Sequence, residues 1–337
     1  MRMRSARTAP MRNFVVPILL FLLTIGSFSG EAHRPIPNLR IPAQIEMRPV
    51  ILKHDDPSLR KVGGLIYLGG WQLDSRDLAF GSYSALVFDG TRFTAISDAG
   101  GILSFAMDGQ DRIVDARFGD LAQGPGRGLE KIDRDAESLA IDPSTGRLWV
   151  GYEHWNAIWR YAPAFTHAEA SVRPAAMQEW PDNGGAEAMV RLRSGRFLVF
   201  SEAGDGPGSS RAVLLFPGDP TISGTPILFG YAPPKGFRIT DAAELPDGRL
   251  VLLHRRISIG GGIMSKLAVV DPRAIEPGAI ITGREIATLA WPLIADNFEG
   301  IAVTREPGRT ILWLISDDNF SPFQRTLLLK FALDEQA

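Results

Sequence analysis

The sequence contains no cysteine among its 337 residues, and this absence excludes several kinds of protein. Disulfide bonds, thiolate catalysis, zinc–thiolate sites and a lipid-modified cysteine all require that residue. The chain also lacks a G-x-S-x-G nucleophile elbow, a P-loop, a dinucleotide-binding fingerprint and an H-E-x-x-H sequence. The acidic, histidine and arginine side chains therefore remain as the candidates for chemistry.

Neither a basic stripe nor a long apolar segment stands out. The net charge is -2, which argues against nucleic acid as a partner. Residues 14–25 are apolar and follow four arginines, whereas a membrane span needs about 20 apolar residues. Residues 1–30 therefore predict a secretory signal peptide, with an uncleaved membrane anchor as the alternative. We expect a periplasmic or secreted protein with no membrane span after cleavage, because export without disulfides fits a periplasm.

The rest of the chain predicts β-structure organised in repeats. Residues 31–60 form an extended, proline-rich lead-in, and residues 61–335 carry five similar hairpins. In each hairpin two apolar strands flank a glycine-containing turn, and the second strand ends in polar or charged residues. The hairpins span residues 83–98, 139–153, 189–202, 243–254 and 301–317.

Weaker strands follow each hairpin and complete units of four strands. Four strands at a period of about fifty residues are typical of a β-propeller, and no segment has a long helical period. The last repeat lacks room for a fourth strand, so we expect residues 65–73 to complete that blade and remove its exposed edge. We count five blades. A sixth would need a hairpin within residues 45–75, and the alternative fold is a β-sandwich.

An acidic residue recurs near the start of the first strand in four repeats. The first strand of a blade lines the central channel, and its start lies beside the end of the antiparallel second strand. The repeated acids should therefore surround one channel mouth; in the first repeat Ser82 or Tyr83 takes this place. The four acids are Glu137, Glu187, Asp241 and Glu299. The second-strand ends on the same face are Ser97-Asp98, Glu153-His154, Ser201-Glu202, His254-Arg255-Arg256 and Asp317-Asp318-Asn319.

Carboxylates this close repel one another, so either the pKa of one of them rises or a cation binds. Hard oxygen donors suit Ca²⁺, and less well Mg²⁺ or Mn²⁺. A bound cation could polarise a phosphoryl or carbonyl oxygen and activate water. The alternative is that each acid caps a strand end or pairs with an arginine. The candidate metal ligands are Glu137, Glu187, Asp241, Glu299, Asp317 and Asp318.

Histidine and arginine side chains near the same strand ends are the candidate catalytic residues. His154 and His254 close second strands, and either could act as a general base. Arginine suits bidentate binding of phosphate or carboxylate, which makes Arg255, Arg256 and Arg325 candidates. The alternatives are ordinary rim histidines, and arginines that are solvated or paired with acids.

Several segments together resemble the bacterial family called "esterase-like activity of phytase" over roughly residues 60–335. The segments are residues 134–140, 185–189, 240–250, 296–302 and 316–331, of which the last two are the most specific. The resemblance implies an exported β-propeller with possible phosphoester hydrolysis. It implies that the family's acidic positions fall on Glu137, Glu187, Asp241, Glu299, Asp317 and Asp318.

These observations lead to one expected function and two alternatives. We expect a metal-dependent phosphoester hydrolase that acts on a small molecule, by metal-assisted attack of water at the acidic channel mouth. The first alternative is a carboxylic ester or lactone hydrolase with His154 or His254 as the base. The second is a non-catalytic propeller that binds a ligand or a protein. The sequence leaves the oligomeric state open.

Overall fold

The computed structural model describes residue 39 and residues 41–127, 130–222, 224–258 and 260–334. The predicted signal peptide, residues 1–30, lies outside the described residues. Within these ranges the chain forms strands and 3-10 helices but no α-helix. No helix of this part has the length and apolar character needed to cross a membrane. The 3-10 helices are η1 (Lys131–Asp133), η2 (Pro163–Phe165), η3 (Ala175–Met177) and η4 (Pro272–Ala274).

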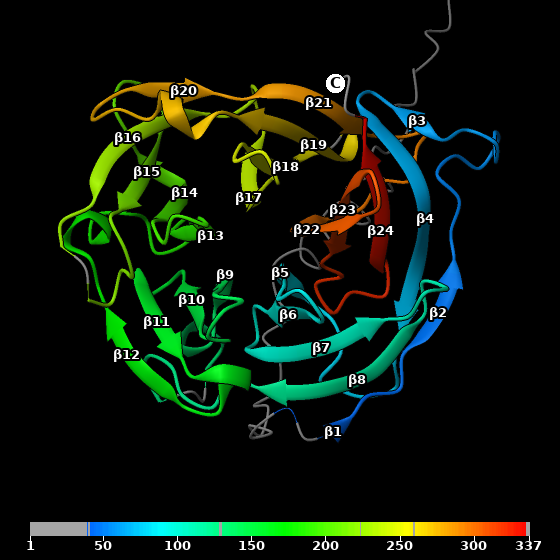
Figure 1. Cartoon of the computed structure of the whole chain (residues 1–337), viewed down its shortest axis with the longest axis horizontal. Helices are drawn as coiled ribbons and strands as arrows, with labels where there is room; N and C mark the ends of the chain where they lie inside the picture. The colour runs from blue at the N-terminus through cyan, green and yellow to red at the C-terminus, as the bar shows by residue number, and fades with distance from the viewer. Residues whose placement is uncertain (1–38, 40, 128–129, 223, 259, 335–337) are drawn as a thin grey trace, which may run out of the picture. The chain divides into compact units, whose positions relative to one another are not determined.

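Five sheets, in each of which the four blade strands are antiparallel, are arranged around a central axis, as Figure 1 shows. Blade 1 contains β5 (Tyr83–Phe88), β6 (Phe93–Ser97), β7 (Gly101–Met107) and β8 (Ile113–Asp120). Blade 2 contains β9 (Ala136–Ile141), β10 (Leu148–Tyr152), β11 (Ala157–Tyr161) and β12 (Ala168–Val172). Blade 3 contains β13 (Ala186–Arg191), β14 (Phe197–Asp205), β15 (Arg211–Phe216) and β16 (Ile227–Ala232).

The remaining two blades complete the ring. Blade 4 contains β17 (Arg238–Glu244), β18 (Leu250–Ser258), β19 (Gly262–Val270) and β21 (Arg284–Leu289). Blade 5 contains β22 (Phe298–Glu306), β23 (Arg309–Ser316), β24 (Thr326–Leu333) and β4 (Leu65–Asp74). The innermost strands β5, β9, β13, β17 and β22 each contact the next around the ring, and β22 contacts β5. The structure therefore confirms the prediction of an all-β, five-bladed propeller.

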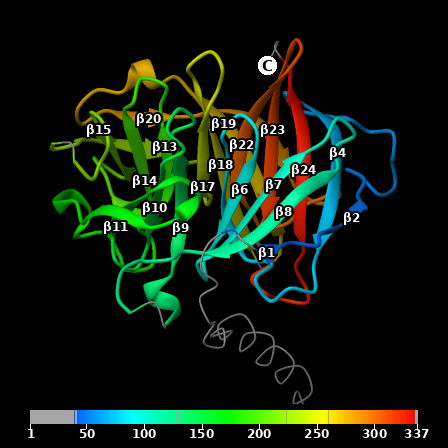
Figure 2. The ribbon, with the colours of Figure 1, turned by 60° about the horizontal axis from the view of Figure 1, so that its bottom comes forward.

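An N-terminal strand closes the ring, also as predicted. β4 pairs antiparallel with β24, with Leu73 opposite Thr326 and Leu65 opposite Leu333. No sixth blade occurs in the described part of the chain. Short strands extend the outer edges of the blades, and Figure 2 shows the strands lengthwise. These strands are β1 (Ile41–Pro42) on β8, β2 (Glu46–Pro49) and β3 (Lys61–Val62) on β4, and β20 (Ile280–Thr282) on β16.

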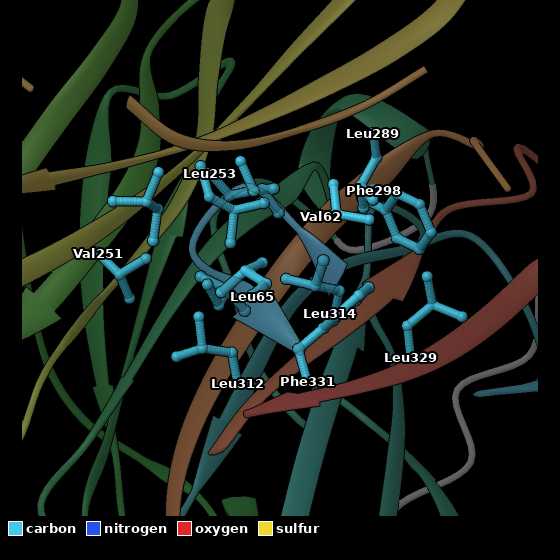
Figure 3. Close-up of a cluster of buried hydrophobic side chains, with 14 of the residues drawn as sticks. Val62, Leu65, Val251, Leu253, Leu289, Phe298, Leu312, Leu314, Leu329 and Phe331 are labelled. Atoms are coloured by element: carbon cyan, nitrogen blue, oxygen red, sulfur yellow. The ribbon is translucent and has the colours of Figure 1, made fainter. Parts of the chain in front are cut away.

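The hydrophobic core lies between neighbouring blades. Between blades 4 and 5, Val251 and Leu253 of β18 pack in one cluster with Leu312, Leu314 and Phe331 of β23 and β24 (Figure 3). Residues two apart on one strand share a face, so each strand contributes alternate side chains to this interface. Burying a side chain of this size stabilises the fold by about 1.5–3 kcal/mol. Without disulfides, these inter-blade clusters hold the ring together.

Candidate functional site

Each innermost strand contains a β-bulge near its start, and the bulge sets the position of one side chain. In β9, Ala136 pairs with Tyr152 and Ser138 pairs with Gly151, so Glu137 between them has no cross-strand partner. A bulge leaves its extra residue unpaired and redirects the side chain. The same register shift occurs in all five blades, and we call the extra residues the bulge ring. They are Ser84, Glu137, Glu187, Thr240 and Glu299.

A second set of five side chains comes from the second strands beside the bulges, directly after the strand in blades 1, 2 and 5 and within it in blades 3 and 4. In each blade the residue that pairs with the position just before the bulge residue is followed directly by a charged residue; Ser97 opposite Tyr83 precedes Asp98, for example. Four of the five are acidic and one is basic. We call this set the strand-end ring: Asp98, Glu153, Glu202, Arg255 and Asp317.

The two rings meet in a cavity of about 190 Å³, the mouth cavity. All five residues of the strand-end ring line it, together with the three glutamates of the bulge ring. Seven carboxylates and three cationic side chains therefore share one small space, an excess of four carboxylates. The other lining residues are Lys131, Asn183, Arg238 and Asn319.

Cationic side chains pair with some of these carboxylates. Lys131 Nζ lies 2.6 Å from Asp98 Oδ2, and Arg238 Nη1 donates to Glu202 Oε2 at 2.6 Å. Arg255 donates to Glu299 Oε1. Ion pairing of this kind compensates three of the seven acids, one from each cation.

Two glutamates of the bulge ring have no direct partner, although the charge of Arg255 acts on Glu187. Glu137 and Glu187 have no hydrogen bond or ion pair from their side chains to the described residues, although Glu187 is only 7% exposed. Burial raises the pKa of Glu137 well above its usual range, and the charge of Glu187 adds to this. Burial also raises the pKa of Glu187, with further contributions from Glu202 and Glu153. Both acids are therefore held where ionisation is unfavourable unless positive charge arrives.

Residues of the strand-end ring also have shifted pKa values. Burial, followed by the charges of Asp135 and Glu202, raises the pKa of Glu153 to about 8. Burial also raises the pKa of Asp317 well above its usual range, and Glu299 contributes to the shift. Burial alone would lower the pKa of Arg255, but the surrounding carboxylates raise it instead.

Three of the acids are close enough together to hold a metal ion. Asp98, Asp135 and Glu137 each offer a carboxylate oxygen, and these atoms all lie within 4.8 Å of one another. Asp98 Oδ1 is buried and has no hydrogen-bond partner among the described residues. Hard oxygen donors at this spacing fit a divalent cation such as Ca²⁺. This acidic cluster could therefore bind a metal ion.

Two of the acids predicted as metal ligands have structural roles instead of lining the mouth cavity. Asp241 Oδ1 accepts the amide of Ala242 at 2.8 Å, and Oδ2 accepts the amide of Ile301 at 2.8 Å. Asp318 Oδ1 accepts the amide of Ser82 at 3.0 Å. For both acids, capping of strands and loops is the arrangement observed.

The two candidate histidines also lie outside the lining of the mouth cavity. His254 is fully buried, with Nε2 2.7 Å from Tyr231 Oη and Nδ1 3.2 Å from the carbonyl oxygen of Lys266. Burial lowers the pKa of His254 to about 4, so it is a neutral core residue with both nitrogens engaged. His154 is half-buried, and its ring meets Trp155 edge-on.

Of the candidate arginines, only Arg255 lines the mouth cavity. The guanidinium of Arg256 lies 4.8 Å from the ring centroid of Phe237. Arg325 Nε donates to Asp296 Oδ2 at 3.1 Å. The structure thus brings together five of the eleven predicted site residues: Glu137, Glu187, Glu299, Asp317 and Arg255.

Several further acids at the site are not among the predicted metal ligands. Asp98, Glu153 and Glu202 line the cavity, and Asp135 belongs to the acidic cluster. Their signal was present, because Asp98 and Glu153 directly follow the last residues of β6 and β10, and Glu202 follows the largely apolar residues 197–201 of β14. The incomplete position in blade 1 is Ser84, where the sequence indicated Ser82 or Tyr83.

Comparison with known proteins identifies a family. The family model described as "Phytase-like: Esterase-like activity of phytase" matches residues 78–320. None of the curated proteins matches the chain.

Several solved structures are similar at 12% identity. The Malassezia sympodialis allergen Mala s 1 has a TM-score of 0.44, with 89% of this chain and 96% of that chain covered. A gluconolactonase from Xanthomonas campestris has a TM-score of 0.41, with 90% and 100% covered. For Kuenenia stuttgartiensis hydrazine synthase the TM-score is 0.36, with 72% of this chain covered, and the match spans only 58% of that chain. These similarities carry no argument about function.

The family match covers the first strand of blade 1 through the loop that follows β23, and it includes every lining residue of the mouth cavity. The chain therefore belongs to the Phytase-like family, which is described as "esterase-like activity of phytase".

Proposed function

We propose that the protein is a metal-dependent hydrolase of small phosphoesters and that the mouth cavity is its active site. Family membership supports a phosphoester or ester substrate. The observation that carries the proposal is the uncompensated charge of the cavity: Glu137 and Glu187 lack partners among the described residues, and Asp98 Oδ1 is buried without one. Such a set is unfavourable without bound positive charge.

The excess of carboxylates also explains why a metal is needed for this substrate class. A phosphoester is an anion, and a cavity with four more carboxylates than cations would repel it. Asp98, Asp135 and Glu137 would hold the cation, and we propose Ca²⁺ because all the donors are oxygen atoms. When bound, the cation would polarise a phosphoryl oxygen and lower the pKa of water.

Blade 4 differs from the other blades in a way that suits an anionic substrate. Four blades place a carboxylate in the strand-end ring, whereas blade 4 places Arg255 there and Thr240 in the bulge ring. Arg238 is the cross-strand partner of Arg255, so two arginines line one side of the cavity. We assign these arginines to binding of the phosphoryl oxygens, for which the guanidinium geometry is well suited.

The ester or lactone route has less support in this cavity. His254, one of the two bases that this route would use, is buried with both nitrogens engaged. His154 lies outside the lining residues. A substrate panel that includes a lactone and an aryl acetate still distinguishes this route from phosphoester hydrolysis.

A hydrolysis panel tests the proposal. Purified protein is assayed with p-nitrophenyl phosphate, bis(p-nitrophenyl) phosphate, p-nitrophenyl acetate and a lactone, with Ca²⁺ or with EDTA. We expect Ca²⁺-dependent turnover of a phosphoester. The variant Glu137→Gln should lose about 100-fold in kcat/KM, which is the scale for losing electrostatic stabilisation. The matched control is Glu179→Gln, at an exposed glutamate outside the cavity, and it should retain full activity.

Two outcomes would contradict the proposal. Turnover of the lactone or acetate alone would favour the carboxylic ester route. Absence of turnover across the panel, with Ca²⁺ bound, would indicate a propeller that binds a ligand or partner without catalysis.

We also propose that the protein is exported to the periplasm or secreted, on the basis of the signal-like residues 1–30. Cell fractionation with N-terminal sequencing tests this. Recovery of the uncleaved chain in the cytoplasm would contradict it.

A further inference from the structure

The mouth cavity is small for a whole drug-sized phosphoester. Its volume of about 190 Å³ compares with roughly 300 Å³ at the lower end for pockets that enclose drug-sized ligands. A cavity of about 150 Å³ holds one benzene molecule. The lining side chains are all charged or amides, so with a cation bound they suit the phosphoryl group and not an apolar one. A large apolar portion of the substrate would therefore lie outside the cavity, at its rim.

One rim loop presents two aromatic side chains at this place. The loop between β23 and β24 begins with Asp317 and Asn319, which both line the mouth cavity. Phe320 follows directly and is 41% exposed, and Phe323 is 90% exposed. A group that projects from the cavity towards this loop would meet apolar surface.

Hydrogen bonds hold this loop in a defined conformation. Asp317 Oδ1 accepts the amide of Asn319 at 2.6 Å, and Asp318 Oδ1 accepts the amide of Phe320 at 3.0 Å. Asp318 Oδ2 accepts from Thr326 Oγ1 at 2.8 Å, which ties the loop to β24. The Phe320 side chain is therefore presented by a fixed backbone.

The loop backbone also adopts a conformation that is unfavourable for its residues. Asn319 has a φ of 50° and Phe320 has a φ of 47°. A bulky residue in this left-handed region is uncommon, at a cost of order 1–3 kcal/mol. Such strain concentrates at ligand-binding sites. Here it falls on Asn319, which lines the cavity, and on Phe320, which carries one of the exposed rings.

Further exposed apolar side chains lie on the same face. The innermost strands begin at the mouth cavity, so the loops that lead into β5 and β22 are on this face. Leu78 in the first loop is 88% exposed and Trp291 in the second is 86% exposed. Single exposed apolar residues are common, but these share a face with the cavity and flank blade 5.

We propose that Phe320 and Phe323 bind an apolar aryl or alkyl group carried by the substrate, whose phosphoryl group enters the mouth cavity. This inference rests on the proposed function and specifies the substrate class as amphipathic phosphoesters. Phe320 and Phe323 determine specificity and are not part of the cation-binding cluster.

Binding of two uncleavable analogues tests the inference. Calorimetry with Ca²⁺ present compares phenylphosphonate with methylphosphonate, which differ only in the apolar group. We expect phenylphosphonate to bind roughly tenfold more tightly, because burying the phenyl group on the rim favours it. The double variant Phe320→Ser/Phe323→Ser should lose most of this preference while retaining Ca²⁺ binding. The matched control is Ile222→Ser, which changes a residue that is 76% exposed in the loop between β15 and β16, at the other end of blade 3.

The possible outcomes separate this inference from the proposed function. Equal binding of both phosphonates, or a preference that the double variant retains, overturns the inference and leaves the phosphoester site intact. Binding of Ca²⁺ but of neither phosphonate overturns both. A change of sedimentation or of vesicle binding in the double variant, with the phosphonate preference unchanged, assigns the rim to a second copy or a lipid surface and also overturns the inference.

Discussion

Without a cation, the protein should lose stability as the pH rises through the range in which Glu153 ionises. Burial, Asp135 and Glu202 raise the pKa of Glu153 from the ordinary 4.5 to about 8. Between these values the folded protein keeps a proton that the unfolded chain has released. The free energy of unfolding therefore falls with rising pH across this window.

The expected magnitude follows from the two pKa values. Glu153 is 6% exposed, so solvent screens the effect only weakly. Each pH unit between the two pKa values is worth about 1.4 kcal/mol, so this single group costs up to about 5 kcal/mol over the whole window and about 2 kcal/mol of that above pH 6.5. The loss above pH 6.5 corresponds to a decrease in Tm of roughly 4 °C for a domain of this size. Glu137, Glu187 and Asp317 shift in the same direction.

The assay is thermal unfolding in EDTA from pH 6.5 to 9 for the wild type and for Glu153→Gln. The scan begins at pH 6.5 because burial lowers the pKa of His254 from 6.5 to about 4, which makes stability rise with pH below that range. Glutamine resembles the protonated acid, so the variant should be more stable at pH 9 and show a weaker pH dependence. Excess Ca²⁺ should remove most of the decrease in the wild type.

The exposed-site variant Glu179→Gln serves as the control for a lost negative charge and should match the wild type. If the wild type and Glu153→Gln lost stability in parallel, or if neither changed between pH 6.5 and 9, the reasoning from buried carboxylates would be refuted.

Three further predictions concern residues around the cavity. His254→Phe removes the partner of the buried Tyr231 hydroxyl and should cost about 1–3 kcal/mol of stability in denaturant unfolding. The Ca²⁺ affinity measured by calorimetry should not change, and weakened Ca²⁺ binding would contradict the structural role. Asp241→Asn weakens the cap on the Ile301 amide and should also lower the free energy of unfolding by about 1–3 kcal/mol. Ca²⁺ binding should stay intact; loss of Ca²⁺ binding at full stability would instead make Asp241 a ligand. Arg238→Gln should raise KM for a phosphoester by about tenfold, the scale of one charge-assisted hydrogen bond, and an unchanged KM would exclude a role in substrate binding.

Much of the fold was predictable because its information is local. Each blade begins with a hairpin whose strands and turn lie within about twenty residues, and strands of this kind have recognisable signals. The closing strand β4 was predictable because blade 5 would otherwise expose the edge of β24. Repetition and edge closure together determine the number of blades.

The site was only partly predictable because β-bulges alter the register by one residue. Glu137, Glu187 and Glu299 are themselves bulge residues, but in blade 4 the bulge residue is Thr240. Asp241 is one position further along, opposite Leu253, and a shift of one residue moves a side chain to the other face. The sequence repeat alone does not reveal this shift.

The strand-end ring escaped full prediction for a different reason. Whether Glu153 or the adjacent His154 faces the channel depends on where the second strand ends, and sequence places that end only within a few residues. In the structure Tyr152 pairs with Ala136, so Glu153 lines the cavity and His154 does not.

The central claim is that the mouth cavity binds a divalent cation through Asp98, Asp135 and Glu137. Calorimetric titration of the metal-free protein with Ca²⁺, together with elemental analysis of the loaded protein, tests it most directly. We predict that the wild type and the control Glu179→Gln bind Ca²⁺ alike, and that Glu137→Gln binds it at least about tenfold more weakly because a charged ligand is lost. Equal affinity in the wild type and Glu137→Gln, or no Ca²⁺ binding by the wild type, would contradict the account.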